Sequence, residues 1–221
     1  MVDEAAFPRP ILTIDVILLT LGAEGLRVGL ISRAGAPYAG RLALIGGYVH
    51  LEEDSDAEAA ARRIVAAKAG LAHVFLEQLQ TFSGRARDPR GWSATVAYYG
   101  LCPPGDLEGA KDVIFRSADN PGPLAFDHAE ILAAALARLR GKGAYSTLPA
   151  FLLPPTFTLS QLHDAYERAM GQPINESAFR RKISELDILE RVDGAFSRAT
   201  ARPAMLYRLR ARTVQAFDRR I

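Results

Sequence analysis

Runs of apolar residues predict most of a β-sheet in the first half of the chain. Residues 11–21 and 26–33 are typical of strands, and the Gly-Ala-Glu-Gly segment 22–25 between them predicts a hairpin with room for a bulge. Tyr98 and Tyr99 are expected to face opposite sides of a strand. Further strands are expected just before Gly46-Gly47 and over residues 74–82, 93–101 and 112–115.

A helical pattern follows Gly46-Gly47. Ser55 with Glu58 three residues later forms a capping box, which marks a helix start, and Gly70 is a stop signal. The apolar residues between them recur at helical spacing; they are Ala57, Ala60, Ala61, Ile64 and Val65. The two glycines therefore lie between a strand and a helix, where the backbone can turn sharply or approach a ligand.

A second helix is predicted near the middle of the chain. Asp127 and Glu130 form a capping box, an apolar stripe follows, and Gly141 marks the end. Two helices with a mixed sheet predict a three-layer α/β/α domain over residues 1–142. Residues 143–157 contain one glycine and three prolines and are predicted to be the linker to a second domain.

The last third of the chain predicts two helices joined by a turn. Thr158 with Gln161 forms a third capping box, and Gly171 ends that helix. Asn175 is expected to cap a second helix over residues 176–186. This order is that of a helix-turn-helix.

Two strands are predicted after these helices. Residues 189–192 and 204–209 are strand-like, and Asp193-Gly194 with the following polar residues is expected to form the turn. Helices and hairpin together predict a winged helix-turn-helix domain over residues 158–221. In such a domain the second helix enters the major groove of DNA, and the wing reaches the backbone or the minor groove.

The predicted second helix separates apolar from polar side chains. Phe179, Ile183 and Leu186 share one face, whereas two arginines and two hydroxyls lie opposite. Arginine can bind guanine or phosphate, and a serine near a helix start suits a phosphate. A solvated run of charge is the alternative explanation. The DNA-binding candidates are Ser177, Arg180, Arg181 and Ser184 on this face, Lys182 for a flanking phosphate, and Arg198 and Arg202 in the wing.

The composition favours a globular protein, because 49% of the 221 residues are hydrophobic. The chain shows no run of about 18 apolar residues and no basic-then-apolar leader, so a cytoplasmic location away from membranes is expected. The single cysteine, Cys102, excludes an intrachain disulfide and a cysteine-rich zinc site. Residues 151–221 hold 12 Lys and Arg against 8 Asp and Glu, and the rest of the chain 15 against 17. Positive charge therefore gathers in the predicted DNA-binding domain.

Residues 45–71 resemble the Nudix box, GX5EX7REUXEEXGU, in which U is an aliphatic residue. In that family, helix glutamates hold divalent cations against a diphosphate and help to activate water. When the closing Gly70 is aligned, the family arginine falls on Arg63, but the glutamates fall on Ile64, Ala67 and Lys68. Isoleucine and alanine supply no oxygen ligand, and the lysine charge repels a cation. We therefore expect a Nudix-like domain that is not an enzyme, with no catalytic residues and no metal ligands.

The loop before the predicted helix also departs from the Nudix pattern. Gly47 and Gly70 are 23 positions apart, against 21 in the family pattern, so residues 49–56 are remodelled. Three explanations of the loop carboxylates stay open: favourable charge at a helix N-terminus, a displaced cation site, or an active site kept by other means. These carboxylates are Glu52, Glu53, Asp54 and Asp56.

Across nearly its whole length the chain resembles the NrtR family, Nudix-related transcriptional regulators of NAD metabolism. The segments that carry this resemblance are IGGYV, FLEQLQTFSGRARDPRGWSATVAYYGL, LAFDHAEI, AYSTLPAFLLPPTFTLSQLHDAYERAMGQPI, SAFRRKI and ARPAMLY. The resemblance implies a homodimeric repressor that binds a palindromic operator on double-stranded DNA. It also implies a response to ADP-ribose or a related NAD-derived nucleotide, and no cofactor.

The resemblance places the effector's diphosphate near the Nudix-like loop and helix. The residues nominated for effector binding are Arg33, Gly46, Gly47, Glu53, Arg63, Arg87, Arg90 and Trp92. The alternatives without a role in ligand binding are that Arg63 only braces the helix against the loop, that Trp92 is a core residue, and that Arg87 and Arg90 are solvated charges of a loop. Two other functions stay open: a Nudix hydrolase of ADP-ribose-like nucleoside diphosphates, and a regulator that responds to a sugar metabolite.

Overall fold

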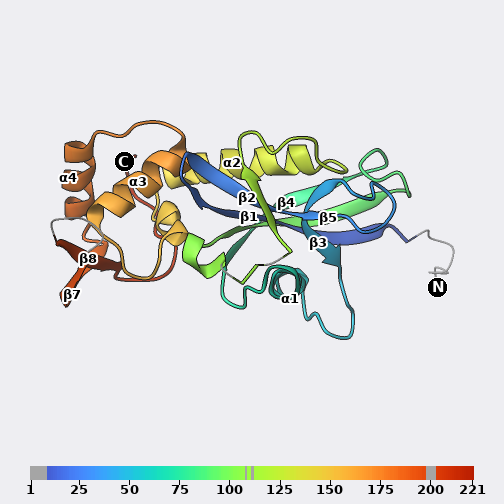
Figure 1. Ribbon diagram of the computed structural model, residues 1–221, viewed down its shortest axis with the longest axis horizontal. Coiled ribbons are helices and arrows are strands. Elements are labelled where there is room, and N and C mark those ends of the chain that lie inside the picture. Colours follow the sequence, from blue (N-terminus) through green and yellow to red (C-terminus); the bar gives the residue numbers. More distant parts are fainter. Residues whose placement is uncertain (1–8, 108, 111, 198–202) are drawn as a thin grey trace.

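The computed structural model in Figure 1 has a layered α/β unit at one end and a smaller unit of helices and a hairpin at the other. It describes residues 9–107, 109–110, 112–197 and 203–221. In the layered unit, helices α1 (Ala57–Ala69) and α2 (His128–Gly143) lie on opposite sides of a six-stranded sheet. The strands are β1 (Ile11–Gly22), β2 (Gly25–Ser32), β3 (Leu42–Tyr48), β4 (Phe75–Gly84), β5 (Ser93–Leu101) and β6 (Ile114–Ser117), and a 3-10 helix, η2 (Pro104–Leu107), follows β5.

The sheet is mixed, with strand order β4-β5-β1-β3-β2-β6. Strand β1 runs parallel to β5 and antiparallel to β2 and β3. Gly22 pairs directly with Gly25, so the first hairpin is tighter than predicted. Asp15 of β1 lies opposite Gly46 of β3, and the site described below depends on this register.

The two faces of the sheet bury separate hydrophobic clusters. Tyr99 belongs to the cluster that contains the apolar stripe of α2, and Tyr98 belongs to the cluster that contains the stripe of α1. The prediction that these neighbours face opposite sides is confirmed. Cys102 is buried, and this burial raises its pKa to about 12. The predicted three-layer α/β/α arrangement is likewise confirmed.

Helix α1 begins one residue later than predicted. Its N-cap is Asp56, whose Oδ1 accepts a hydrogen bond from the Ala59 backbone N–H at 2.8 Å, while Ser55 only donates to the Asp56 carboxylate. The predicted Ser55–Glu58 capping box is therefore wrong. An aspartate caps as well as a serine and adds negative charge at the positive end of the helix dipole. Gly70 ends the helix in the left-handed conformation, as predicted.

The predicted capping box of α2 is also wrong. Asp127 occupies the N-cap position, but its side chain makes no capping hydrogen bond. Its carboxylate is instead bound by Arg87. The helix continues two residues past Gly141 to Gly143, where the chain packs against Pro149. At the start of this helix the Asp127 carboxylate therefore binds a distant arginine and does not cap the backbone N–H groups of the first turn.

The predicted linker, residues 143–157, is packed against the rest of the chain. It contains a 3-10 helix, η3 (Leu148–Leu152), in which all five residues are buried. The C-terminal residues return to this segment, because the Thr147 N–H donates to the Gln215 carbonyl at 2.9 Å and the Phe217 N–H donates to the Tyr145 carbonyl at 2.7 Å. The segment is therefore a structured element and not a loose tether.

The smaller unit has the predicted winged helix-turn-helix order. Helices α3 (Leu159–Met170) and α4 (Glu176–Leu186) are followed by a hairpin of β7 (Leu189–Ser197) and β8 (Ala204–Leu209). The Thr158–Gln161 capping box is present, with both of its hydrogen bonds, and Gly171 ends α3. Asn175 caps α4 by accepting from the Ala178 N–H at 2.9 Å. These predictions are confirmed.

The first strand of the wing, β7, extends further than predicted. Strand β7 runs through Asp193-Gly194 to Ser197, and its register against β8 shifts between Arg191 and Phe196. Gly194 uses its left-handed φ of 69° inside this irregularity, so the predicted turn is an interruption within the strand. Residues 198–202, which include the candidates Arg198 and Arg202, lie outside the described residues.

The two units share one hydrophobic cluster, which runs from the α2 face of the sheet into α3 and α4. The Tyr166 hydroxyl on α3 donates to the Ser146 carbonyl at 2.7 Å, and the Phe179 ring on α4 lies against the Tyr166 ring. Arg168 on α3 donates to the Gly22 carbonyl at the β1–β2 hairpin. None of the helices within these described ranges is long and apolar enough to cross a membrane.

Candidate functional site

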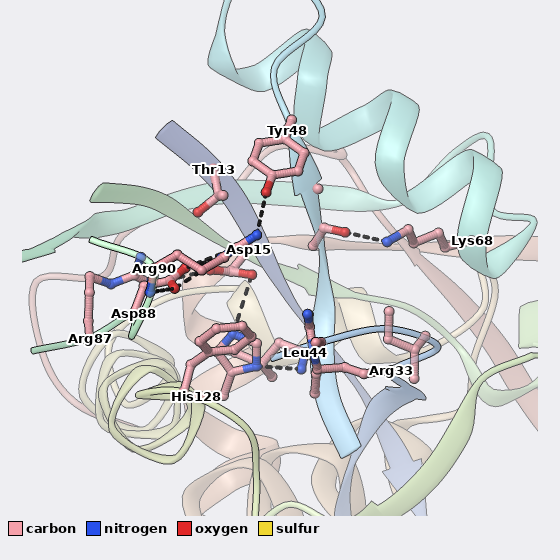
Figure 2. Close-up of a pocket in the computed structure, with 16 residues that line it drawn as sticks. Thr13, Asp15, Arg33, Leu44, Tyr48, Lys68, Arg87, Asp88, Arg90 and His128 are labelled. Atoms are coloured by element: carbon pink, nitrogen blue, oxygen red, sulfur yellow. Dashed lines mark hydrogen bonds and ion pairs between the residues drawn. The ribbon is translucent and has the colours of Figure 1, made fainter. Parts of the chain in front are cut away.

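A cavity of about 360 Å³ opens over the end of β3, between α1, the β4–β5 loop and the first turn of α2. Figure 2 shows charged side chains entering it from several elements. Its lining is Thr13, Asp15, Ile31, Arg33, Ala36, Ala43, Leu44, Gly46, Gly47, Tyr48, Lys68, Arg87, Asp88, Arg90, Phe126 and His128.

Gly46 has no room for a side chain. A Cβ at this position would lie 2.9 Å from the Ile14 carbonyl oxygen and would collide with the Asp15 carboxylate. Asp15 therefore takes the space that any other residue at position 46 would fill. The glycine is required because a carboxylate approaches the strand from its neighbour.

Asp15 belongs to a buried cluster of charges beneath the cavity. Arg87 donates to both oxygens of Asp127, at 2.9 and 3.1 Å, and its guanidinium also lies 3.7 Å from Asp15. The side chains of Arg87, Asp15 and Asp127 are 9%, 8% and 14% exposed. One arginine thus faces two carboxylates, that of Asp127 at the start of α2 and that of Asp15 on β1. A charge this buried needs such partners.

His128 links the same cluster to β3. Its Nδ1 accepts a hydrogen bond from the Leu44 backbone N–H at 2.9 Å, so the ring proton of the neutral side chain sits on Nε2, which lies 3.6 Å from Asp15. Burial lowers the pKa of His128 below its ordinary value, although the Asp15 charge opposes this effect. The ring is therefore neutral near pH 7 and fixes the start of α2 to the central sheet.

Arg90 extends along the opposite rim. It donates to the Asp88 carboxylate through two nitrogens, with a shortest distance of 2.7 Å, and to the Tyr48 hydroxyl at 2.6 Å. The hydrogen bonds from Arg90 to Asp88 lower the pKa of the Asp88 carboxyl. The loop arginine is thus held in a defined position, with the Tyr48 ring beside it at the end of β3.

Arg33 closes the cavity from the segment after β2. Its Nε donates to the Pro37 carbonyl at 2.8 Å, and its guanidinium lies 4.6 Å from the centre of the Phe126 ring. Tyr38 meets the same ring edge-on at 4.9 Å. Phe126 adopts a positive φ of 53°, which a bulky residue rarely does. This corner therefore combines a cation with aromatic surface.

Lys68 reaches the cavity from the last turn of α1, where its Nζ donates to the Gly46 carbonyl (Figure 2). A neighbouring cavity of about 410 Å³ is also lined by Lys68 and Arg33. Partial burial lowers the pKa of Lys68; the charge of Asp15 opposes this shift and that of Arg33 adds to it. The lysine that replaces a Nudix glutamate therefore points into the site.

The side chains around this helix do not suit a divalent cation. Ile64 is 2% exposed and packs beneath Gly47, and Ala67 supplies no donor atom. Across the described ranges, no group of three or more His, Cys, Asp or Glu residues is arranged to hold a metal ion. A hard cation needs several oxygen ligands, which these positions do not provide.

Five of the eight nominated effector residues line the cavity: Arg33, Gly46, Gly47, Arg87 and Arg90. The other three lie outside it. Arg63 donates twice to Asp54 at 2.7 Å and once to the Tyr48 carbonyl at 2.9 Å, and it approaches Glu53 to 3.7 Å. These hydrogen bonds bring the pKa of Asp54 to about 2. Trp92 is 47% exposed and so is not a core residue.

Asp88 lies in the nominated loop of residues 87–92, whereas five further lining residues were not predicted from the sequence: Asp15, Tyr48, Lys68, Phe126 and His128. One signal was available, because Asp15 stands alone inside a long apolar strand and a buried carboxylate needs a partner. The others meet only through the strand register and the return of the chain into α2.

Four of the five α4 candidates have exposed side chains. Phe179 and Ile183 are buried, as predicted, whereas Ser177, Arg180, Arg181 and Ser184 are exposed and Lys182 is half-buried. Arg180 pairs with Glu176 at 2.7 Å and donates to the Ser160 hydroxyl at 3.2 Å. The Arg181 side chain is 78% exposed, and its nearest carboxylate oxygen, on Glu185, is 3.8 Å away.

Comparison with known proteins places these features in one family. A family model described as the NrtR DNA-binding winged helix domain matches residues 149–209. The ADPR responsive transcriptional repressor NtrR of Acinetobacter baylyi is 36% identical over 215 residues, which cover 93% of this chain and 84% of that protein.

Solved structures extend the likeness to the three-dimensional fold. Shewanella oneidensis NrtR complexed with a 27mer DNA has a TM-score of 0.86 and 32% identity, covering 95% of this chain and 99% of that chain. The NUDIX domain of the same protein complexed with ADP ribose has a TM-score of 0.56 and 33% identity, covering 62% of this chain and 93% of that chain. Because the Acinetobacter repressor is 36% identical over 93% of this chain, the chain belongs to the NrtR family of transcriptional regulators, which join a Nudix-related domain to a winged helix.

Proposed function

We propose that this protein is a transcriptional repressor whose Nudix-like domain binds ADP-ribose or a related NAD-derived nucleotide and thereby modulates DNA binding by the winged helix. The observation that carries the proposal is a cationic and aromatic cavity joined to the winged helix by one helix. The Acinetobacter relative is named as ADPR responsive, and Shewanella relatives were solved with DNA and with ADP ribose.

The cavity chemistry supports a nucleotide effector. Four cations line it, Arg33, Lys68, Arg87 and Arg90. Phosphates favour such side chains because each hydrogen bond to them is assisted by charge. The Phe126 and Tyr48 rings in the same lining provide apolar surface on which a base or a ribose can rest. Arg87 and Arg90 already face carboxylates. A neutral sugar would leave the charges of Arg33 and Lys68 without an anionic partner, so a phosphorylated ligand fits better.

We propose that the cavity binds this nucleotide without hydrolysing it. Hydrolysis of a diphosphate by a Nudix enzyme depends on helix carboxylates that hold metal ions. Here the corresponding positions carry Ile64 in the core, Ala67, and Lys68 in the cavity. The cavity retains Asp15 and Asp88, but each already faces an arginine.

Helix α2 is the element through which the two parts are coupled. At its start, Asp127 and His128 belong to the charged cluster of the cavity. At its end, Gly143 packs near Pro149 of the linker and Met170 of α3. A helix of 16 residues spans about 24 Å at ~1.5 Å per residue. A small shift of the cluster can therefore reach α3, and through Phe179 it can reach α4.

We divide the chain into an effector domain over residues 1–142, a packed linker over residues 143–157 and a DNA-binding domain over residues 158–221. In the DNA complex, α4 lies in the major groove, with Arg180 and Arg181 toward base edges or phosphates. Ser177, Ser184 and Lys182 contact the backbone. A homodimer places two such helices about one helical turn apart, or a multiple of it, which matches a palindromic operator.

The proposal is tested by a gel-shift on the DNA just upstream of the protein's own gene, repeated with ADP-ribose, NAD and a sugar. We expect a specific complex whose stability changes with ADP-ribose and not with the sugar. A complex that responds only to the sugar would show that the effector is a sugar and not a nucleotide. The absence of any specific complex would contradict the proposed role in transcription.

A further inference from the structure

Lys68 occupies the place in this site where the fold family would require a metal ligand. The Nudix pattern implies a divalent cation held by carboxylates on α1, yet the residues present do not fit one. Ile64 is buried beneath Gly47, and Lys68 brings a positive charge to the cavity. The loop carboxylate Asp54 does not offer a replacement site, because Arg63 already binds both of its oxygens at 2.7 Å.

The four cations of the cavity fall into two classes. Arg87 and Arg90 each face a carboxylate at hydrogen-bond distance, Asp127 and Asp88 respectively. Arg33 and Lys68 have only neutral acceptors, the carbonyls of Pro37 and Gly46. Within the part of the chain that the structure describes, neither Arg33 nor Lys68 forms an ion pair.

These two cations also lie together. Both line the main cavity and the adjoining one, in which Asp112 is the only acidic lining residue among those described. The charge of Arg33 helps to lower the pKa of Lys68, so the two positive groups repel each other across the cavity. A ligand with two negative charges would relieve this repulsion. The bridge of a nucleoside diphosphate derivative carries about two such charges, one on each phosphate.

We propose that Lys68 and Arg33 bind the bridging diphosphate of the effector directly, so that effector binding needs no divalent cation. This inference rests on the proposed function and adds the way in which the same site recognises its ligand. The ammonium group has three donors, and Gly46 accepts only one of them. Two donors remain for phosphate oxygens. In this role a fixed side-chain charge takes the place of a dissociable metal ion.

The first arm of the test varies the metal. Calorimetric titration of the full-length protein with ADP-ribose is carried out in EDTA and then in excess magnesium. We expect dissociation constants that agree within about twofold. Binding that appears only with magnesium would overturn this inference and leave the proposed function standing. Absence of ADP-ribose binding in both conditions would reject the proposed function and this inference with it.

The second arm varies the charge. Lys68→Met keeps the length of the side chain but removes the ammonium group, and we expect about 10- to 100-fold weaker binding of ADP-ribose in EDTA, the range for a lost charged hydrogen bond. Arg62→Met is the matched control, because Arg62 is an exposed cation on the same helix that lies outside the main cavity. Equal affinity of Lys68→Met and the wild type, with both proteins folded by circular dichroism, would contradict the assignment.

Discussion

The Arg87 guanidinium donates two hydrogen bonds to the carboxylate of Asp127, and this carboxylate makes no capping hydrogen bond to α2, the helix that follows it. The pair lies at the meeting point of the effector cavity and α2. Under the proposed function, an anionic effector in this cavity would compete with Asp127 for the same guanidinium. Release of Asp127 would let it bind the free N–H groups of the first turn. Ligand binding would thus alter the start of the helix that carries the winged helix.

We predict that Arg87→Ala strongly destabilises the fold. Removing this side chain leaves the nearly buried carboxylates of Asp15 and Asp127 without their cation. The free energy of unfolding should fall by about 3–5 kcal/mol, as for other buried pairs that lose one partner. Urea denaturation followed by circular dichroism measures this change. The control is Arg85→Ala in the same loop, since Arg85 is exposed and should cost little.

Stability should also depend on pH through His128. Burial lowers the folded-state pKa of His128 below the unfolded value of 6.5, so the unfolded chain takes up this proton first as the pH falls. The contribution of the neutral ring is therefore complete above pH 6.5 and is lost as the pH falls toward the folded-state pKa.

His128→Asn is the variant that isolates this effect. An asparagine oxygen can still accept from the Leu44 N–H but does not titrate. We expect the free energy of unfolding of the variant to change less between pH 7 and pH 5 than that of the wild type, with His73→Asn, at an exposed histidine, as the control. Identical pH profiles of stability for His128→Asn and the wild type would exclude His128 as the source of the pH dependence.

On the DNA-binding side, Arg181→Ala should weaken operator binding by about 1–3 kcal/mol if the arginine contacts a base edge. A phosphate contact would instead weaken all DNA sequences similarly and reduce the salt dependence of binding by about one ion. Fluorescence anisotropy on operator and scrambled DNA at several salt concentrations separates these roles. Unchanged affinity in both Arg180→Ala and Arg181→Ala would remove α4 from the groove.

The proposal that the cavity binds its nucleotide without hydrolysing it can be tested directly. When it is incubated with magnesium, the purified protein should leave ADP-ribose intact. The reason is that Ile64, Ala67 and Lys68, at the positions of the Nudix glutamates, supply no metal ligands. Chromatography of the nucleotide products over several hours measures this. Steady formation of AMP, lost on substitution of a cavity residue such as Asp15→Asn, would show that the site turns its ligand over.

Local signals in the sequence located the elements of the winged helix well. Thr158 and Asn175 cap α3 and α4 where expected, and the side-chain hydrogen bonds found for them among the described residues are the capping bonds themselves. At Asp127 the same signal failed, since Arg87, 40 residues away, binds the carboxylate. A capping pattern describes only local partners. Competition from a distant charge becomes visible only when the fold is known.

The candidate cavity was predictable only in part. Gly46 and Arg33 could be nominated from the Nudix-like segment and its surroundings, but Asp15 and His128 are brought there by strand register and by the return of the chain into α2. Lys68 was recognised as a lost metal ligand, although its side chain points into the cavity. The sequence shows which residue is substituted, and the geometry shows what the new residue can contact.

Under the proposed function, the effector cavity and the α4 surface, far apart on the chain, are energetically linked. The most direct test of this linkage is the affinity of the protein for ADP-ribose, measured by titration with and without saturating operator DNA. Linkage requires that the ligand and the DNA alter each other's affinity by the same factor, typically about 5- to 150-fold. We predict a difference of this size, and equal ADP-ribose affinities of the free and the DNA-bound protein would contradict the account.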